Sequence, residues 1–176
     1  MRNIFLFALI LMTASANCAE ARGIKKMNQI FSITSPAFKD SQTIPFRYSG
    51  RGENLNPALE ISGIPGGTKS LVLIMDDIDA PGGTFDHWIM FNVSPRTTKI
   101  YEGTTPVEAN FGVNSAGSIG YYGPNPPPGK AHHYTFRLFA LDSTLQLKNG
   151  ADRADIESAM AKHVIGKAEL VGLFGR

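Results

Sequence analysis

The stretch LVLIMDD, residues 71–77, decides the fold class. The run from Leu71 to Met75 is apolar without a break. Because it has no polar face, it predicts a central strand in a sheet that is covered on both sides. Asp76 and Asp77 follow directly and are expected to end this strand.

The rest of the chain divides into short segments. Its 18 glycines and 11 prolines are spread along the sequence, which is typical of a mostly β domain. We predict strands at residues 30–34, 44–48, 58–61, 71–75, 88–93, 134–141 and 168–173. One helix is predicted near the C-terminus, with Asp152 as its N-cap and Gly166 as its stop. Its apolar stripe would be Ile156, Ala159, Met160 and Val164.

The overall composition indicates one globular domain, which we place at residues 22–176. Of the 176 residues, 43% are hydrophobic and 18% are charged. The formal net charge is only +2, and the charged residues are evenly scattered along the chain, so no nucleic-acid partner is expected.

Residues 1–21 have the pattern of an export signal. Arg2 precedes an apolar stretch, Ile4 to Met12, and small residues follow at Ala16, Ala19 and Ala21. The apolar stretch is shorter than the ~20 residues of a membrane-spanning helix, so we expect cleavage between Ala16 and Ala21. The protein would then be periplasmic or secreted, without stable membrane insertion. An uncleaved anchor is the alternative.

Cys18 is the only cysteine and lies within that segment. Ser15 and Asn17 do not fit the usual surroundings of a lipid-modified cysteine. Cleavage beyond Cys18 would leave a domain without disulfides or a thiolate metal site.

The segment YYGPNPPPGKAHHYTFRLFALD, residues 121–142, contains the first candidate site. Its prolines predict a stiff loop before the strand. Alternation places His132 and Tyr134 on the more apolar face of that strand and His133 on the other. An imidazole beside a tyrosine hydroxyl suits an anionic group such as phosphate or carboxylate. A core pair bonded to backbone carbonyls is the alternative.

A second group of polar residues surrounds the next connection, in DDIDAP (residues 76–81) and DHW (residues 86–88). Alternation predicts that His87 shares a face with Ile89, Phe91 and Val93. A carboxylate near the end of the preceding strand could orient this imidazole or keep it protonated. Alternatively, Asp77 and Asp79 bond only to loop backbone.

Together the three motifs resemble the phosphatidylethanolamine-binding protein family, in particular its bacterial Raf-kinase-inhibitor-like branch. The resemblance covers roughly residues 30–176. It implies an antiparallel β-sandwich with a C-terminal helix and a pocket for a small anion or phospholipid head group, without a cofactor. The implied ligand-binding residues are Asp77, His87, His132, Tyr134 and Pro127. The implied supporting loop residues are Asp79, Pro81, Gly123, Pro124, Asn125 and Pro126.

The sequence departs from the family pattern at three positions. Ile78 stands where the family usually has proline. A proline would restrict the backbone of the loop bearing Asp77, and an isoleucine does not. His133 replaces an arginine, so a group that titrates replaces a permanent cation. Ile61 replaces a tryptophan.

Several functions stay open at this stage. The preferred one is an exported anion-binding module without turnover, and the resemblance adds a possible protein partner such as a peptidase. In one alternative the protein is a peptidase inhibitor whose pocket is only structural. In another, Asp77, His87 and His132 form the triad of a metal-dependent enzyme, although no local metal motif supports it. The G-x-S-x-G motif of a serine hydrolase is absent.

Overall fold

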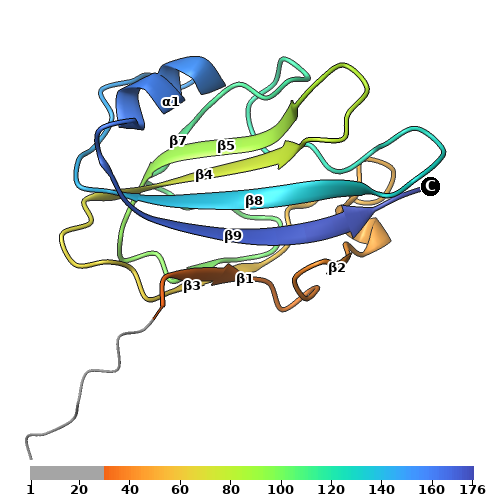
Figure 1. Cartoon of the computed structure of the whole chain (residues 1–176), viewed down its shortest axis with the longest axis horizontal. Helices are drawn as coiled ribbons and strands as arrows, with labels where there is room; N and C mark the ends of the chain where they lie inside the picture. The colour runs from red at the N-terminus through yellow and green to blue at the C-terminus, as the bar shows by residue number, and fades with distance from the viewer. Residues whose placement is uncertain (1–29) are drawn as a thin grey trace, which may run out of the picture.

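The computed structural model describes residues 30–176, in which two β-sheets pack face to face (Figure 1). The smaller sheet has the order β1-β3-β6, and the larger has the order β2-β9-β8-β4-β5-β7. Only the short β2–β9 pair in the larger sheet is parallel. The strands are β1 (Ser32–Thr34), β2 (Gln42–Thr43), β3 (Leu59–Ser62), β4 (Ser70–Asp77), β5 (Phe85–Val93), β6 (Lys99–Ile100), β7 (Asn110–Phe111), β8 (His132–Leu141) and β9 (Val164–Phe174). The single α-helix of this region, α1, spans Arg153–Met160.

The larger sheet separates two hydrophobic cores. The main core lies between the sheets and includes Leu73, Met75 and Phe136. The second lies on the other face and includes Ile74 together with Ile156 of α1. Both faces of the larger sheet are therefore covered, as the apolar run at residues 71–75 predicted. The expected sandwich with a helix near the C-terminus is confirmed, and β9 follows that helix.

Strand β4 is the central element and is buried throughout its length. It continues through Asp76 and Asp77, which pair with β8 and β5. The prediction that these aspartates end the strand was therefore wrong. Because side chains alternate between faces, Asp77 lies on the side of the main core and Asp76 on the side of α1.

Strand β5 departs from regular pairing at two places. Met75 pairs with Trp88, but the next pair is Asp76 with Asp86, so β5 has one extra residue there. This residue is His87, and the irregularity has the form of a β-bulge. A second irregularity occurs at Asn92, whose φ is 54°. Simple alternation along the sequence therefore does not tell on which face of the sheet a β5 side chain lies.

Two predicted elements differ from the structure. Residues 44–48 do not form a strand; Phe46–Tyr48 is a short 3₁₀ helix preceded by Pro45. Proline has no N–H for a β ladder, and its carbonyl instead accepts the Tyr48 N–H. Asp152 caps α1 as predicted by accepting a hydrogen bond from the Asp155 N–H. The helix ends at Met160, however, and Gly166 lies inside β9.

Several loops gather at one end of the larger sheet, the end near the C-terminus in Figure 1. The connection from β4 to β5 begins there, because Asp77 pairs with Phe85. The proline-rich loop enters β8 at His132, which pairs with Phe174 of β9. This end brings both histidine motifs together beside the main core.

Candidate functional site

A cavity of about 190 Å³ opens among these loops. Three strands contribute to it: Asp77 from β4, Phe85 and His87 from β5, and His132 and Tyr134 from β8. Its remaining wall comes from loops, through Ala80, Pro81, Tyr122, Asn125, Pro126 and Pro127. All five side chains implied as ligand-binding residues therefore line one cavity.

His132 is held by a carboxylate. Its Nδ1 lies 2.8 Å from Asp77 Oδ2, and both side chains are buried. The other oxygen of Asp77 accepts the Asp79 N–H at 2.9 Å. Asp77 thus orients the imidazole and also the start of the β4–β5 loop. Nε2 is the ring nitrogen of His132 that stays available to a ligand.

His87 is held by a backbone carbonyl. Its Nδ1 lies 2.6 Å from the oxygen of Tyr122, so Nδ1 carries the proton and donates. Burial lowers the pKa of His87, although the Tyr122 carbonyl and the Asp77 carboxylate act in the opposite direction. The ring also packs on Tyr134, with centroids 5.1 Å apart.

Tyr134 has a completely buried side chain, and its hydroxyl has no hydrogen-bond partner in the structure. Burial, followed by the charge of the Asp77 carboxylate and its closeness to the hydroxyl, raises the pKa of Tyr134. The hydroxyl is therefore a neutral donor, and it lies near Asp77 without meeting the geometry of a hydrogen bond. An unpartnered hydroxyl in such a place is costly, by roughly 1–3 kcal/mol. Its position in the cavity wall indicates that a ligand could supply the missing partner.

A profile of the family described as "Phosphatidylethanolamine-binding protein" matches residues 34–175. The chain belongs to this family. Members similar to it include a UPF0098 protein of Methanothermobacter thermautotrophicus, which is 45% identical over 150 residues, covering 82% of this chain and 99% of that protein. A candidate lipoprotein of Mycobacterium tuberculosis, LppC, is 41% identical over 144 residues, with coverage of 81% and 71%.

Two solved structures have the same fold as this phosphatidylethanolamine-binding protein family member. A family homologue from Chlamydia trachomatis is 38% identical with a TM-score of 0.80, covering 84% of this chain and 98% of that chain. YbcL of E. coli, described as a new member of the mammalian family, is 28% identical with a TM-score of 0.78, with coverage of 83% and 98%.

The prediction that the His87 side chain lies on the same face of β5 as Ile89, Phe91 and Val93 was wrong. Ile89 and Phe91 pack in the core beneath α1, whereas His87 lines the cavity with Tyr134. The β-bulge is the physical reason, because it adds one residue between Trp88 and Asp86 and turns the imidazole to the other face.

The supporting residues divide into two groups. Pro81, Asn125 and Pro126 line the cavity directly. Gly123 and Pro124 instead anchor the loop from outside: the Gly123 N–H bonds to Asn54 Oδ1 at 2.7 Å, and the Pro124 carbonyl accepts the Gly50 N–H at 3.0 Å.

Asp79 and His133 form a clip at the cavity rim. Asp79 Oδ2 accepts the backbone N–H of His133 at 2.8 Å and lies 2.7 Å from its ring Nδ1. The hydrogen bond from the His133 ring lowers the pKa of Asp79. Of the other departures from the family pattern, Ile78 is exposed beside this clip and Ile61 is buried in the main core.

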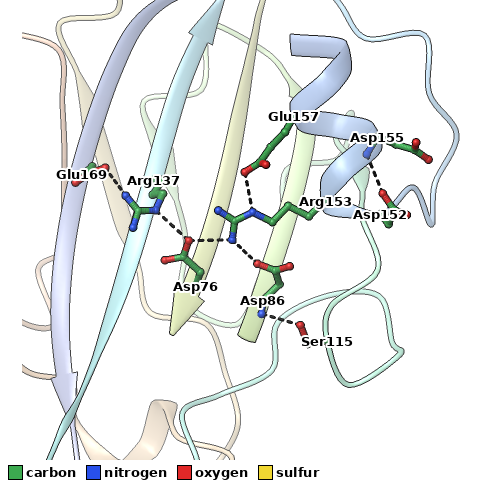
Figure 2. Close-up of polar contacts among 9 residues, drawn as sticks. All are labelled: Asp76, Asp86, Ser115, Arg137, Asp152, Arg153, Asp155, Glu157 and Glu169. Atoms are coloured by element: carbon green, nitrogen blue, oxygen red, sulfur yellow. Dashed lines mark hydrogen bonds and ion pairs between the residues drawn. The ribbon is translucent and has the colours of Figure 1, made fainter. Parts of the chain in front are cut away.

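A partly buried ion-pair network lies on the opposite face of the sheet (Figure 2). Arg153 Nη1 lies 3.0 Å from Asp76 Oδ2 and 2.6 Å from Asp86 Oδ1, and Arg137 Nε also lies 3.0 Å from Asp76 Oδ2. Each aspartate directly precedes a cavity residue, Asp77 or His87. The sequence interpretation missed this network, and it also missed Phe85 and Tyr122 as cavity residues. The adjacency of Phe85 and Tyr122 to DHW and GPNPPP was the available signal.

Within residues 30–176 no three His, Cys, Asp or Glu side chains are arranged to hold a metal ion. Asp77 is instead engaged by His132, so the proposed triad of Asp77, His87 and His132 has no support from the geometry. No helix in the same region has the length and apolar character needed to span a membrane. The predicted export signal and Cys18 lie outside the described residues and stay predictions.

Proposed function

We propose that this cavity binds a small oxyanion, either free phosphate or the phosphate of a head group, and that the protein works as a binding module. The observation that carries the proposal is the Tyr134 hydroxyl, which is buried and lacks a partner beside two imidazoles. A phosphate oxygen would accept its hydrogen bond and remove the cost of leaving it unpaired.

The walls favour a small ligand. The volume of about 190 Å³ is below the ~300–1,000 Å³ of pockets for drug-sized ligands. Its lining combines the polar side chains of Asp77, His87 and His132 with the apolar ones of Pro126, Pro127 and Phe85. This arrangement would hold the charged end of a ligand inside and leave a short apolar or neutral substituent at the rim.

The site of action would be outside the cytoplasm. The export pattern of residues 1–21 supports this part of the proposal. The similarity to LppC, a candidate lipoprotein, is consistent with it.

Calorimetric titration of the metal-stripped protein with phosphate and with glycerophosphoethanolamine tests the proposal. We expect saturable binding with one site, and we expect His132→Ala to abolish it. His163→Ala is the matched control, because His163 also pairs with an aspartate, Asp142, at 2.8 Å but lies outside the cavity. If the unmodified protein bound neither phosphate nor glycerophosphoethanolamine, the proposal would be rejected.

Binding of only one of these ligands identifies the source of the phosphate. Preference for glycerophosphoethanolamine would favour a phospholipid head group, whereas equal or stronger binding of phosphate would favour the free ion.

A further inference from the structure

We infer that the cavity selects an oxyanion that carries a proton of its own, such as hydrogen phosphate, over a proton-free oxyanion such as sulfate. This inference rests on the proposed function and specifies the ligand class of the same site. The hydrogen-bonding roles of His87 and Tyr134 carry it.

The free nitrogen of His87 has a fixed role. A carbonyl oxygen can only accept, so the 2.6 Å contact with the Tyr122 oxygen requires the proton on Nδ1. In a neutral imidazole the other nitrogen, Nε2, is then an acceptor. A ligand that reaches Nε2 must therefore donate a hydrogen bond.

The surroundings of His87 favour its neutral form. His87 is 4% exposed. The aromatic rings of Phe85 and Tyr134 pack against the imidazole, with ring centroids 4.8 and 5.1 Å from its own. Burial lowers its pKa, and the negative charges of Asp77, Asp86 and Asp76 only partly oppose this. No carboxylate among the described residues forms a hydrogen bond or an ion pair with this ring. The other imidazole in the cavity, His132 of β8, is engaged through Nδ1 by Asp77.

Tyr134 requires the opposite partner. Its buried hydroxyl makes no hydrogen bond in the structure, although the Asp77 carboxylate is near, so an incoming oxyanion could accept its proton in a hydrogen bond. Hydrogen phosphate matches both groups, because its P–OH donates to His87 Nε2 and another oxygen accepts from Tyr134. Sulfate offers only acceptors, and one of its oxygens would face the Nε2 lone pair.

The mismatch predicts a measurable selectivity. Leaving a buried hydrogen-bonding group unpaired costs roughly 1–3 kcal/mol, so we expect phosphate to bind at least ~10-fold more tightly than sulfate. The comparison is made at about pH 7.5, where a neutral His87 is expected because the ordinary histidine pKa is about 6.5. Both forms of phosphate at that pH still carry a proton, whereas sulfate carries none.

Titration of the unmodified protein with potassium phosphate and potassium sulfate, at about pH 7.5 and then at successively lower pH, is the test. The selectivity should fall once the pH drops below the lowered pKa of His87, since a protonated His87 donates to either anion. Tyr134→Phe should weaken both anions and keep their ratio. His87→Gln should lower the ratio, because a glutamine amide can donate to sulfate as well.

Nitrogen NMR of the ring gives a second readout that needs no variant. In the anion-free protein at about pH 7.5, His87 should show a proton on Nδ1 and none on Nε2. A protonated Nε2, or equal affinity for both anions at that pH, would overturn the inference and leave the proposed function intact. Failure of both anions to bind would reject the proposed function itself.

Discussion

Asp76 and Asp86 lie directly opposite each other on β4 and β5, although both are carboxylates, the first buried and the second partly buried. Like charges in such a pair repel each other, and Arg153 bridges them through a single nitrogen, Nη1 (Figure 2). This pair marks one end of the bulge that contains His87. The register of the cavity residues is therefore held in place from the opposite face of the sheet.

Arg153→Gln should destabilise the protein and also weaken phosphate binding. Arg153 is partly buried, and its loss leaves both carboxylates without this partner, at a cost of about 1–3 kcal/mol. Urea unfolding measures this loss, and calorimetry should show at least ~10-fold weaker phosphate binding because the bulge loosens.

Arg137→Gln is the control for that experiment. Arg137 also pairs with Asp76, at 3.0 Å, but its other ion pair is with Glu169 and it forms none with Asp86. Its loss should lower stability while phosphate affinity stays within about twofold of the original. Equal loss of affinity in both variants would show that the effect is general destabilisation and is unrelated to the bulge.

Tyr134→Phe should make the ligand-free protein more stable and the phosphate complex weaker. The substitution removes a buried hydroxyl that has no partner, so we expect a gain of about 1 kcal/mol in the free energy of unfolding. Phosphate affinity should fall about tenfold. Tyr121→Phe is matched to it, because the Tyr121 hydroxyl donates to the Tyr48 carbonyl at 2.8 Å. That control should lose stability and keep its affinity, and the reverse pattern would contradict the assignment of the two hydroxyls.

Stability should decline as the pH falls through the mildly acidic range. The pKa of His87 in the folded protein is lowered by burial, whereas in the unfolded chain it is about 6.5. The unfolded chain therefore binds the proton first, and the contribution of His87 is fully present above about pH 6.5 and lost as the pH falls through the folded-state value. Urea midpoints between about pH 7.5 and pH 5 should show this decline.

One variant identifies the source of that decline. His87→Gln should flatten the pH dependence, because it removes the buried imidazole. The lowered pKa of Asp79 acts separately, because its contribution is lost only below the ordinary aspartate range of about 3.9. An unchanged slope in His87→Gln would show that another group titrates.

Gly123→Ala should disrupt the proline-rich wall of the cavity. A Cβ at this position would lie 2.5 Å from the Tyr48 carbonyl oxygen and 2.6 Å from the Gly50 nitrogen, and backbone atoms cannot easily move away. Crowding of this kind costs about 1–3 kcal/mol, and we expect weaker phosphate binding as well. Gly66→Ala has open space around it and should change stability by less than about 0.5 kcal/mol. Thermal unfolding of both variants checks the difference.

The sequence predicted the face of His132 and Tyr134 because β8 pairs with β9 in unbroken register from His132 to Ala140. It failed for His87 because alternation cannot reveal a bulge, which depends on the pairing of two strands. The helix was predicted too long for a related reason: Val164 continues the helical spacing of the stripe but belongs to β9. A local pattern fits two structures there, and packing selects one of them.

The tertiary contacts behind the site could not be read from the chain. Arg153 and Asp86 are 67 positions apart, and nothing in the local sequence joins them. The residues of the proline-rich loop were easier to assign, since stiff segments depend little on distant partners. Even so, only the structure separates Asn125, Pro126 and Pro127, which line the cavity, from Gly123 and Pro124, which anchor the loop.

The extra residue of β5 makes the length of this segment as important as its composition. Losing the codon for Asp86 would restore a regular ladder and place His87 opposite Asp76, on the side of α1. The imidazole would then leave the cavity although the gene still encoded every cavity residue. Alignments of relatives should therefore be checked for gaps between residues 85 and 88 before any of them is credited with the same binding site.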